Sequence, residues 1–176
     1  MNPLVVGIDP GGKNTGLVVR RGQELIGHEV VTSDTPAIGL PSMDYMRAVA
    51  AAFYRLVHDR FVDVYALEDV TPPRGFKNGR RDAIQPGSLI GVSAMAGFFL
   101  STIPGVVLIP PARNGSRPLT SYPPQLVGPR EKTGGGILRH ARSAWDVAGA
   151  ASNNHRRTHK ESREDHEVPE HHSHAW

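Results

Sequence analysis

The pattern of apolar and polar positions changes its period along the chain. Short apolar runs rich in β-branched residues predict strands over residues 4–9, 15–19, 24–31, 63–69 and 105–109. Apolar or small residues at helical spacing predict helices over residues 43–59, 86–101 and 137–151. Three strands joined by tight turns come first, and the later strands alternate with helices. This order predicts an α/β domain with a mixed sheet, in which an antiparallel three-strand meander is extended by parallel strands and flanked by helices.

The C-terminal stretch has a different composition from the rest. Residues 152–176 hold six of the nine histidines, together with many charged and few apolar residues. Such a segment buries too little apolar surface to offset the entropy lost on ordering. We therefore expect one folded domain over residues 1–151 and a disordered, His-rich charged tail over residues 152–176.

Length and composition narrow the functional classes. The chain has 176 residues, 39% of them apolar, and no stretch approaches the ~20 consecutive apolar residues of a membrane span. It contains no cysteine, which excludes disulfides, thiolate metal ligands and a cysteine nucleophile. The first residues lack the basic and apolar regions of a secretory signal. We expect a single domain in a reducing, cytoplasmic environment.

Charge is unevenly distributed, although the formal net charge is only +3. Residues 74–81 contain four basic residues and no acidic one, and residues 113–142 contain six basic residues against Glu131 alone. Local basic patches on a nearly balanced chain suggest a polyanionic partner such as nucleic acid. The alternative is that both segments are simply solvated loops.

Three carboxylates stand among apolar neighbours, where an unpaired charge is costly. Asp9 ends the first strand, Glu68 lies near the end of the fourth, and Asp146 lies within the final helix. Any one of them could be a helix cap or an ion-pair partner. If the first and fourth strands are neighbours, Asp9 and Glu68 project from one end of the sheet, and a helix packed across that end delivers Asp146. Three converging carboxylates repel one another unless a cation neutralises them, and hard oxygen ligands favour Mg²⁺ or Mn²⁺.

These positions lie in motifs that resemble a known group of nucleases. The sequence VVGIDPG at residues 5–11, followed by Gly16, resembles the opening strand of the RNase H-like superfamily and is most similar to RuvC-type Holliday-junction resolvases. YALE at residues 65–68 and SAWDVA at residues 143–148 resemble their second catalytic strand and their last helix. The resemblance covers about residues 4–151. The short, loop-rich chain is more similar to the phage-borne branch of the family than to the bacterial housekeeping enzymes.

The resemblance implies a fold and an activity. The fold would be RNase H-like, with the nuclease domain over residues 1–151. The activity would be that of a Mg²⁺-dependent endonuclease, with Mn²⁺ as a substitute, that resolves Holliday junctions by paired nicks and acts on other branched DNA such as flaps and forks. Asp9, Glu68 and Asp146 would be the metal ligands. Symmetric nicking also implies a two-fold homodimer. The apolar helix over residues 86–101 is the best candidate for the dimer interface; the alternative is that it is simply core.

The identity of a fourth site residue stays open. Members of the family usually carry four acidic residues, the last two within one turn of the final helix, whereas here Ser143 stands one turn before Asp146. His140 lies about 120° from Asp146 around the helix axis and joins the site only if the helix starts late. A histidine there could ligate metal or position water. Asp69 is a further candidate, although strand alternation points it away from Glu68.

A basic loop follows Glu68. It places one aromatic residue, Phe76, among four cations, which are Arg74, Lys77, Arg80 and Arg81. Cations bind phosphates, and an aromatic ring can stack on an opened base step. The related resolvases are similar in placing an aromatic residue near this point to hold the junction centre open; the alternative for Phe76 is a loop anchor tucked under the domain. Lys13 and Lys132 are further candidates for phosphate contact.

Two other functions compete with this interpretation. The segment DPGGKNTG at residues 9–16 also resembles the first phosphate loop of sugar kinases and actin-like ATPases. Those proteins need a second domain, for which this chain has no room. The other alternative is a catalytically impaired relative that binds branched DNA without cutting it, and the missing fourth carboxylate supports it.

Overall fold

A five-stranded mixed sheet forms the centre of the protein. The computed structural model describes residues 2–35, 39–70 and 86–164. The strands are β1 (Leu4–Asp9), β2 (Asn14–Arg21), β3 (Glu24–Thr32), β4 (Val64–Glu68) and β5 (Val107–Ile109), in the order β3-β2-β1-β4-β5. β2 pairs antiparallel with both β1 and β3, whereas β4 pairs parallel with both β1 and β5. The predicted meander with parallel additions is confirmed, and with it the α/β fold class.

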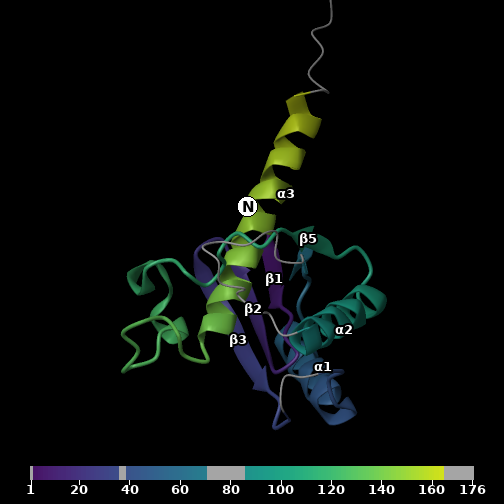
Figure 1. Cartoon of the computed structure of the whole chain (residues 1–176). Helices are drawn as coiled ribbons and strands as arrows, with labels where there is room; N and C mark the ends of the chain where they lie inside the picture. Colours follow the sequence, from purple (N-terminus) through teal and green to yellow (C-terminus); the bar gives the residue numbers. More distant parts are fainter. Residues whose placement is uncertain (1, 36–38, 71–85, 165–176) are drawn as a thin grey trace, which may run out of the picture.

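Helices cover both faces of this sheet (Figure 1). α1 (Met43–Val57) and α2 (Pro86–Thr102) pack on one face, and α3 (Arg139–Glu164) crosses the other. Two short 3-10 turns, η1 (Leu119–Ser121) and η2 (Pro124–Leu126), lie in the long irregular segment between β5 and α3. Within the described residues, no helix is long and apolar enough to cross a membrane.

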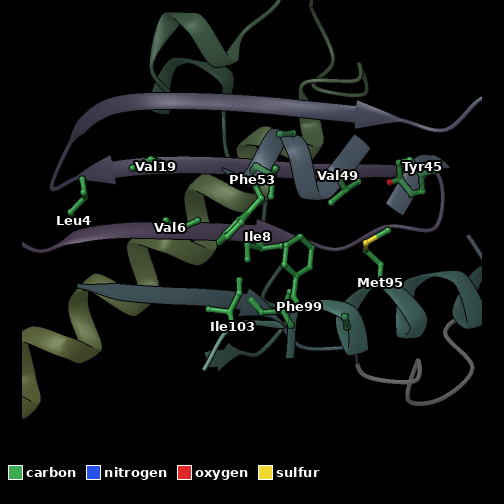
Figure 2. Packing of buried hydrophobic residues seen from close by; sticks show 14 residues of the cluster. Leu4, Val6, Ile8, Val19, Tyr45, Val49, Phe53, Met95, Phe99 and Ile103 are labelled. Carbon is green, nitrogen blue, oxygen red and sulfur yellow. The ribbon is translucent and has the colours of Figure 1, made fainter. Parts of the chain in front are cut away.

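The larger hydrophobic core lies between the sheet and the pair α1 and α2. Strand alternation sends Val6 and Ile8 of β1 into this core, which also contains Phe53 of α1 and Phe99 of α2 (Figure 2). The rings of Phe53 and Phe99 lie 5.8 Å apart in an edge-to-face arrangement. The other face of β1 presents Val5 to α3. β1 is therefore buried on both faces, which makes it a rigid support for the residues at its carboxyl end.

Two glycines let α3 lie close against the sheet. A Cβ added at Gly7 of β1 would lie 2.0 Å from the carbonyl oxygen of Ala144, and one at Gly16 of β2 would lie 2.1 Å from that of His140. Neither distance is sterically tolerable, so a side chain at either position would force α3 away from the sheet. Gly7 and Gly16 thus allow the short distance between α3 and strands β1 and β2.

The C-terminal boundary is where the sequence prediction was wrong. α3 continues to Glu164, so residues 152–164 are helical rather than disordered. Ser152 is buried, and Arg156 donates hydrogen bonds to the side chains of Asn2 at 3.4 Å and Asn153 at 2.6 Å. The prediction weighed only apolar burial, whereas a helix already nucleated in the core gains one hydrogen bond for each residue added. Residues 165–176 lie outside the described residues, and the other element boundaries lie within two residues of the predicted ones.

Candidate active site

Two carboxylates lie side by side at one end of the sheet. Asp9 is the last residue of β1 and Glu68 the last residue of β4, and these strands pair parallel with Ile8 opposite Leu67. Both side chains are half-buried. Burial, and after it the negative charge of nearby Asp9, raises the pKa of Glu68 to about 7. The two predicted residues are therefore brought together, and burial beside a second carboxylate favours a proton or a cation on Glu68.

Hydrogen bonds fix the orientation of the Glu68 carboxylate. The Nδ2 amide of Asn114 donates to Oε1 at 2.9 Å, and the hydroxyl of Ser143 donates to Oε2 at 2.8 Å. Asn114 comes from the irregular segment after β5, and Ser143 comes from the second turn of α3. Both donors lower the pKa of Glu68, but the effects of burial and of Asp9 outweigh them. The carboxylate is held by groups that reach it from two separate parts of the chain.

His140 lies against Asp9 from the first turn of α3. Its Nδ1 is 2.8 Å from Oδ2 of Asp9. An ionised carboxylate only accepts hydrogen bonds, so Nδ1 carries the proton in this pair, and Nε2 is the nitrogen left for other chemistry. The helix starts at Arg139, late enough to include His140 in the site. The geometry thus brings both His140 and Ser143 to the carboxylates.

These residues line a cavity of about 460 Å³ whose rim carries cations. Asp9, Glu68, His140, Ser143 and Asn114 form its acidic and polar part. Two exposed basic residues, Lys13 and Arg139, line the same cavity. Acidic groups inside and cations at the rim form an arrangement that suits a metal-bound phosphate group.

The structure places Asp146 outside this cavity, which corrects its predicted role beside Asp9 and Glu68. Its Oδ2 accepts hydrogen bonds from the backbone N–H of Gly115 at 2.9 Å and from the hydroxyl of Tyr122 at 2.8 Å. Its Oδ1 pairs with the guanidinium of Arg117. Asp146 lies about 120° around the helix from His140, so α3 cannot direct both toward the same carboxylates. It binds the irregular segment to α3 instead.

The remaining predicted residues fall in different places. Asp69 does not line the cavity, and its backbone N–H donates to the carbonyl of Ile109. Lys132 lines an adjacent basic cavity together with Arg117 and Arg139. The loop residues predicted to contact DNA lie outside the described residues: Arg74, Phe76, Lys77, Arg80 and Arg81.

A buried ion pair anchors the segment that carries Lys132. The side chain of Arg142 is fully buried and contacts Glu131 through two hydrogen bonds, at 2.9 and 2.6 Å. These bonds, together with backbone N–H donors at Gly128 and Gly136, lower the pKa of Glu131 to about 2. Arg142 also donates to the carbonyls of Leu126 and Gly134. The segment before α3 is therefore tied firmly to the helix.

Sequence reasoning did not identify Asn114 or Arg139 as site residues. Asn114 lies 46 positions from Glu68 in a stretch without regular periodicity, so no sequence signal indicates their contact. Arg139 is the first residue of α3, and its exposed side chain lines both the active-site cavity and the adjacent basic cavity.

The donor set suits a hydrated divalent cation. Among the described residues, no group of three or more His, Asp or Glu side chains is arranged as a ready metal cluster. Mg²⁺ retains several waters and commonly binds through one or two carboxylates together with substrate phosphate oxygens. Asp9 and Glu68 supply two such carboxylates, and the negative charge of Asp9 contributes, after burial, to the raised pKa of Glu68. These two residues fit such an ion as its primary ligands, with His140 beside them.

Comparison with known proteins identifies the fold. No protein-family model matches the chain, and no curated protein matches its sequence. The structure is similar to that of T. thermophilus RuvC in complex with a Holliday junction substrate, with a TM-score of 0.54 and 17% identity over 89% of this chain and 96% of that chain. It is also similar to another T. thermophilus RuvC structure, with a TM-score of 0.47 and 18% identity over 88% of this chain and 97% of that chain. The first likeness confirms the RuvC-type fold that the sequence motifs predicted.

Proposed function

We propose that this protein is a divalent-metal-dependent endonuclease that cleaves branched DNA and resolves four-way junctions by paired nicks. The observation that carries the proposal is the pairing of Asp9 with Glu68 at the ends of adjacent parallel strands, with His140 against Asp9. This constellation occurs on a RuvC-type fold, and the RuvC of the similar structure holds a Holliday junction substrate. Fold alone does not specify an activity, so the chemistry of the site is the main support.

Asp9 and Glu68 would hold the cation. When bound, such an ion polarises a phosphodiester and lowers the pKa of an attacking water. Asn114 and Ser143 keep the Glu68 carboxylate oriented, so no reorganisation is needed when substrate arrives. Asp9 holds the Nδ1 proton of His140, which leaves Nε2 to accept or donate a proton at the reacting phosphate.

Substrate affinity would come from the cations around the cavity. Lys13 and Arg139 line the site itself, and Lys132 lies in the neighbouring basic cavity. Contacts to phosphate are independent of sequence and weaken as salt rises. The basic loop, with Phe76 as a wedge at the junction centre, remains a prediction from the sequence.

Paired nicks require two active sites, and hence a two-fold dimer. α2 is the proposed interface because it has apolar side chains both on the face buried in the core and on the face exposed to solvent. Met95 and Phe99 are buried in the core, whereas Ile90 and Leu100 are about half exposed. The same helix therefore contributes to the core and still presents apolar side chains to a partner.

A branched-DNA-binding protein without nuclease activity is the second candidate. The observation that favours it is the small number of carboxylates in the cavity. Asp146 is occupied by Arg117 and Tyr122, and the neutral hydroxyl of Ser143 contacts Glu68 where the family pattern has an acidic residue. The actin-like ATPase alternative gains no support, because the RuvC-type fold accounts for 89% of the chain.

The decisive experiment separates binding from cleavage on a synthetic four-way junction. The wild-type protein should bind the junction with or without divalent ions, and should cut it only when Mg²⁺ or Mn²⁺ is added. A linear duplex of the same sequence is the substrate control and should remain largely uncut. Tight junction binding without cleavage in either metal would reject the nuclease and favour the non-catalytic binder.

A further inference from the structure

A second cavity, of about 440 Å³, adjoins the candidate active site and is strongly basic. Four arginines line it, which are Arg20, Arg113, Arg117 and Arg156, against a single carboxylate, Asp146. We refer to this cavity as the arginine pocket. It draws these residues from β2, from the segment after β5 and from α3. A concentration of guanidinium groups from three elements on one cavity requires an explanation.

Two of the arginines serve partly as structure. Arg20 is only 5% exposed, donates to the Trp145 carbonyl at 2.9 Å and stacks 3.6 Å above the centre of the Trp145 ring. Arg117 is the ion-pair partner of Asp146. These contacts hold Arg20 and Arg117 in place within the pocket lining. The one carboxylate in the pocket, Asp146, is already paired with Arg117.

The other two arginines have no anionic partner in the described part of the chain. Among the described residues, the guanidinium of Arg156 donates hydrogen bonds to the neutral side chains of Asn2 and Asn153. The exposed guanidinium of Arg113 makes no hydrogen bond or ion pair with another described residue. Burial, and after it repulsion from Arg117, lowers the pKa of Arg20 to about 10. The pocket therefore has the charge and the free donors to bind an anion.

We propose that the arginine pocket binds a phosphate group, supplied by the backbone of a DNA strand that extends from the active-site cavity. The planar fork of a guanidinium matches phosphate oxygens, and arginine is the residue most suited to recognise them. Asn114 lines both cavities and donates to Glu68, so one side chain connects the pocket to the metal-binding carboxylate. The DNA source of the phosphate rests on the proposed function, whereas the phosphate site itself does not.

The pocket can be tested directly with inorganic phosphate in the absence of divalent ions. Trp145 lies in the pocket wall, and the only other tryptophan, Trp176, is removed by Trp176→Phe in every variant. A phosphate titration should change the Trp145 fluorescence saturably. The double variant Arg113→Gln, Arg156→Gln should weaken this binding by at least about tenfold, because each lost contact is charge-assisted.

The matched control is Arg47→Gln, Arg60→Gln, which removes the same charge beside α1 on the opposite face of the sheet. It should leave phosphate affinity unchanged within about twofold. Both double variants are surface substitutions, so unchanged thermal unfolding should show that each has folded. Absence of a saturable response, or equal weakening in the two double variants, would overturn the phosphate site.

A second measurement identifies the source of the phosphate. Junction DNA binding without divalent ions is measured between about 50 and 300 mM salt. If backbone phosphates occupy the pocket, the pocket variant should lose about one unit of salt slope per contact, and inorganic phosphate should compete with DNA. Unchanged DNA binding in a variant that has lost phosphate binding would overturn the DNA assignment and identify free phosphate as the ligand. Neither measurement uses cleavage, so failure of the proposed nuclease would not affect them.

Discussion

Replacing Glu68 with glutamine should stabilise the metal-free protein at alkaline pH. The folded protein holds the pKa of Glu68 at about 7, above its ordinary value of 4.5, chiefly because of burial and the charge of Asp9. For a group whose pKa is raised on folding, the stability contribution is complete below the unfolded pKa. It is lost as pH rises through the folded pKa. The wild type should therefore lose stability between about pH 4.5 and pH 7, and Glu68→Gln should not show this part of the loss.

The size of the effect follows from the shift. Each pKa unit corresponds to about 1.4 kcal/mol, so a shift from 4.5 to about 7 sets an upper limit near 3 kcal/mol. Glu68 retains some solvent contact, which reduces the figure to about 2 kcal/mol. For a chain of this length, that difference corresponds to a rise of roughly 4–8 °C in Tm. Glutamine can still accept from Asn114 and can donate to Asp9, so the site remains filled.

The assay is thermal unfolding of both proteins at about pH 5 and pH 8, with EDTA and then with Mg²⁺. Glu68→Gln should exceed the wild type at pH 8 in EDTA, and Mg²⁺ should stabilise only the wild type, because only it presents two adjacent carboxylates. Glu24→Gln, at an exposed position, is the control for loss of a charge. The reasoning fails if Glu68→Gln is less stable than the wild type at pH 8, or if the difference between the two does not change with pH.

Three further predictions concern the surroundings of the site. Gly16→Ala should cost about 1–3 kcal/mol in chemical denaturation, and should slow cleavage, because the new methyl group displaces His140. Ser143→Ala removes a hydrogen bond that lowers the pKa of Glu68, so the rise of the pH–rate profile should move to higher pH. Phe76→Ala should weaken binding or cleavage roughly ten- to hundredfold on a closed four-way junction and much less on a fork, since only the junction needs opening. Equal loss on the two substrates would leave Phe76 as a loop anchor.

The sequence predicted the fold and the strand residues of the site for physical reasons. Buried strands and amphipathic helices leave clear hydrophobic periods, and tight turns link the first three strands. Asp9 and Glu68 follow apolar runs directly, and the carboxyl ends of paired parallel strands meet at one edge of the sheet. Once the order of the strands was predicted correctly, the proximity of Asp9 and Glu68 followed from it.

The helix residues could not be assigned in the same way. α3 is apolar or small over much of its first half, so the sequence does not reveal which face meets the carboxylates. The close approach of the helix at Gly7 and Gly16 decides its placement, and that contact joins residues more than 120 positions apart. The ion pair between Asp146 and Arg117 likewise depends on the path of the irregular segment before α3.

The most direct test of the site compares Asp9→Asn with Asp146→Asn in single-turnover cleavage of a four-way junction with Mg²⁺. Asp9→Asn should bind the junction with wild-type affinity and cut it at least about a hundredfold more slowly, because it removes a ligand charge while the basic contacts remain. Asp146→Asn should be less stable than the wild type, because it weakens the pair with Arg117, but should still cut the junction when folded. Full cleavage by Asp9→Asn, or abolished cleavage by folded Asp146→Asn, would contradict the assignment of the active site to Asp9, Glu68 and His140.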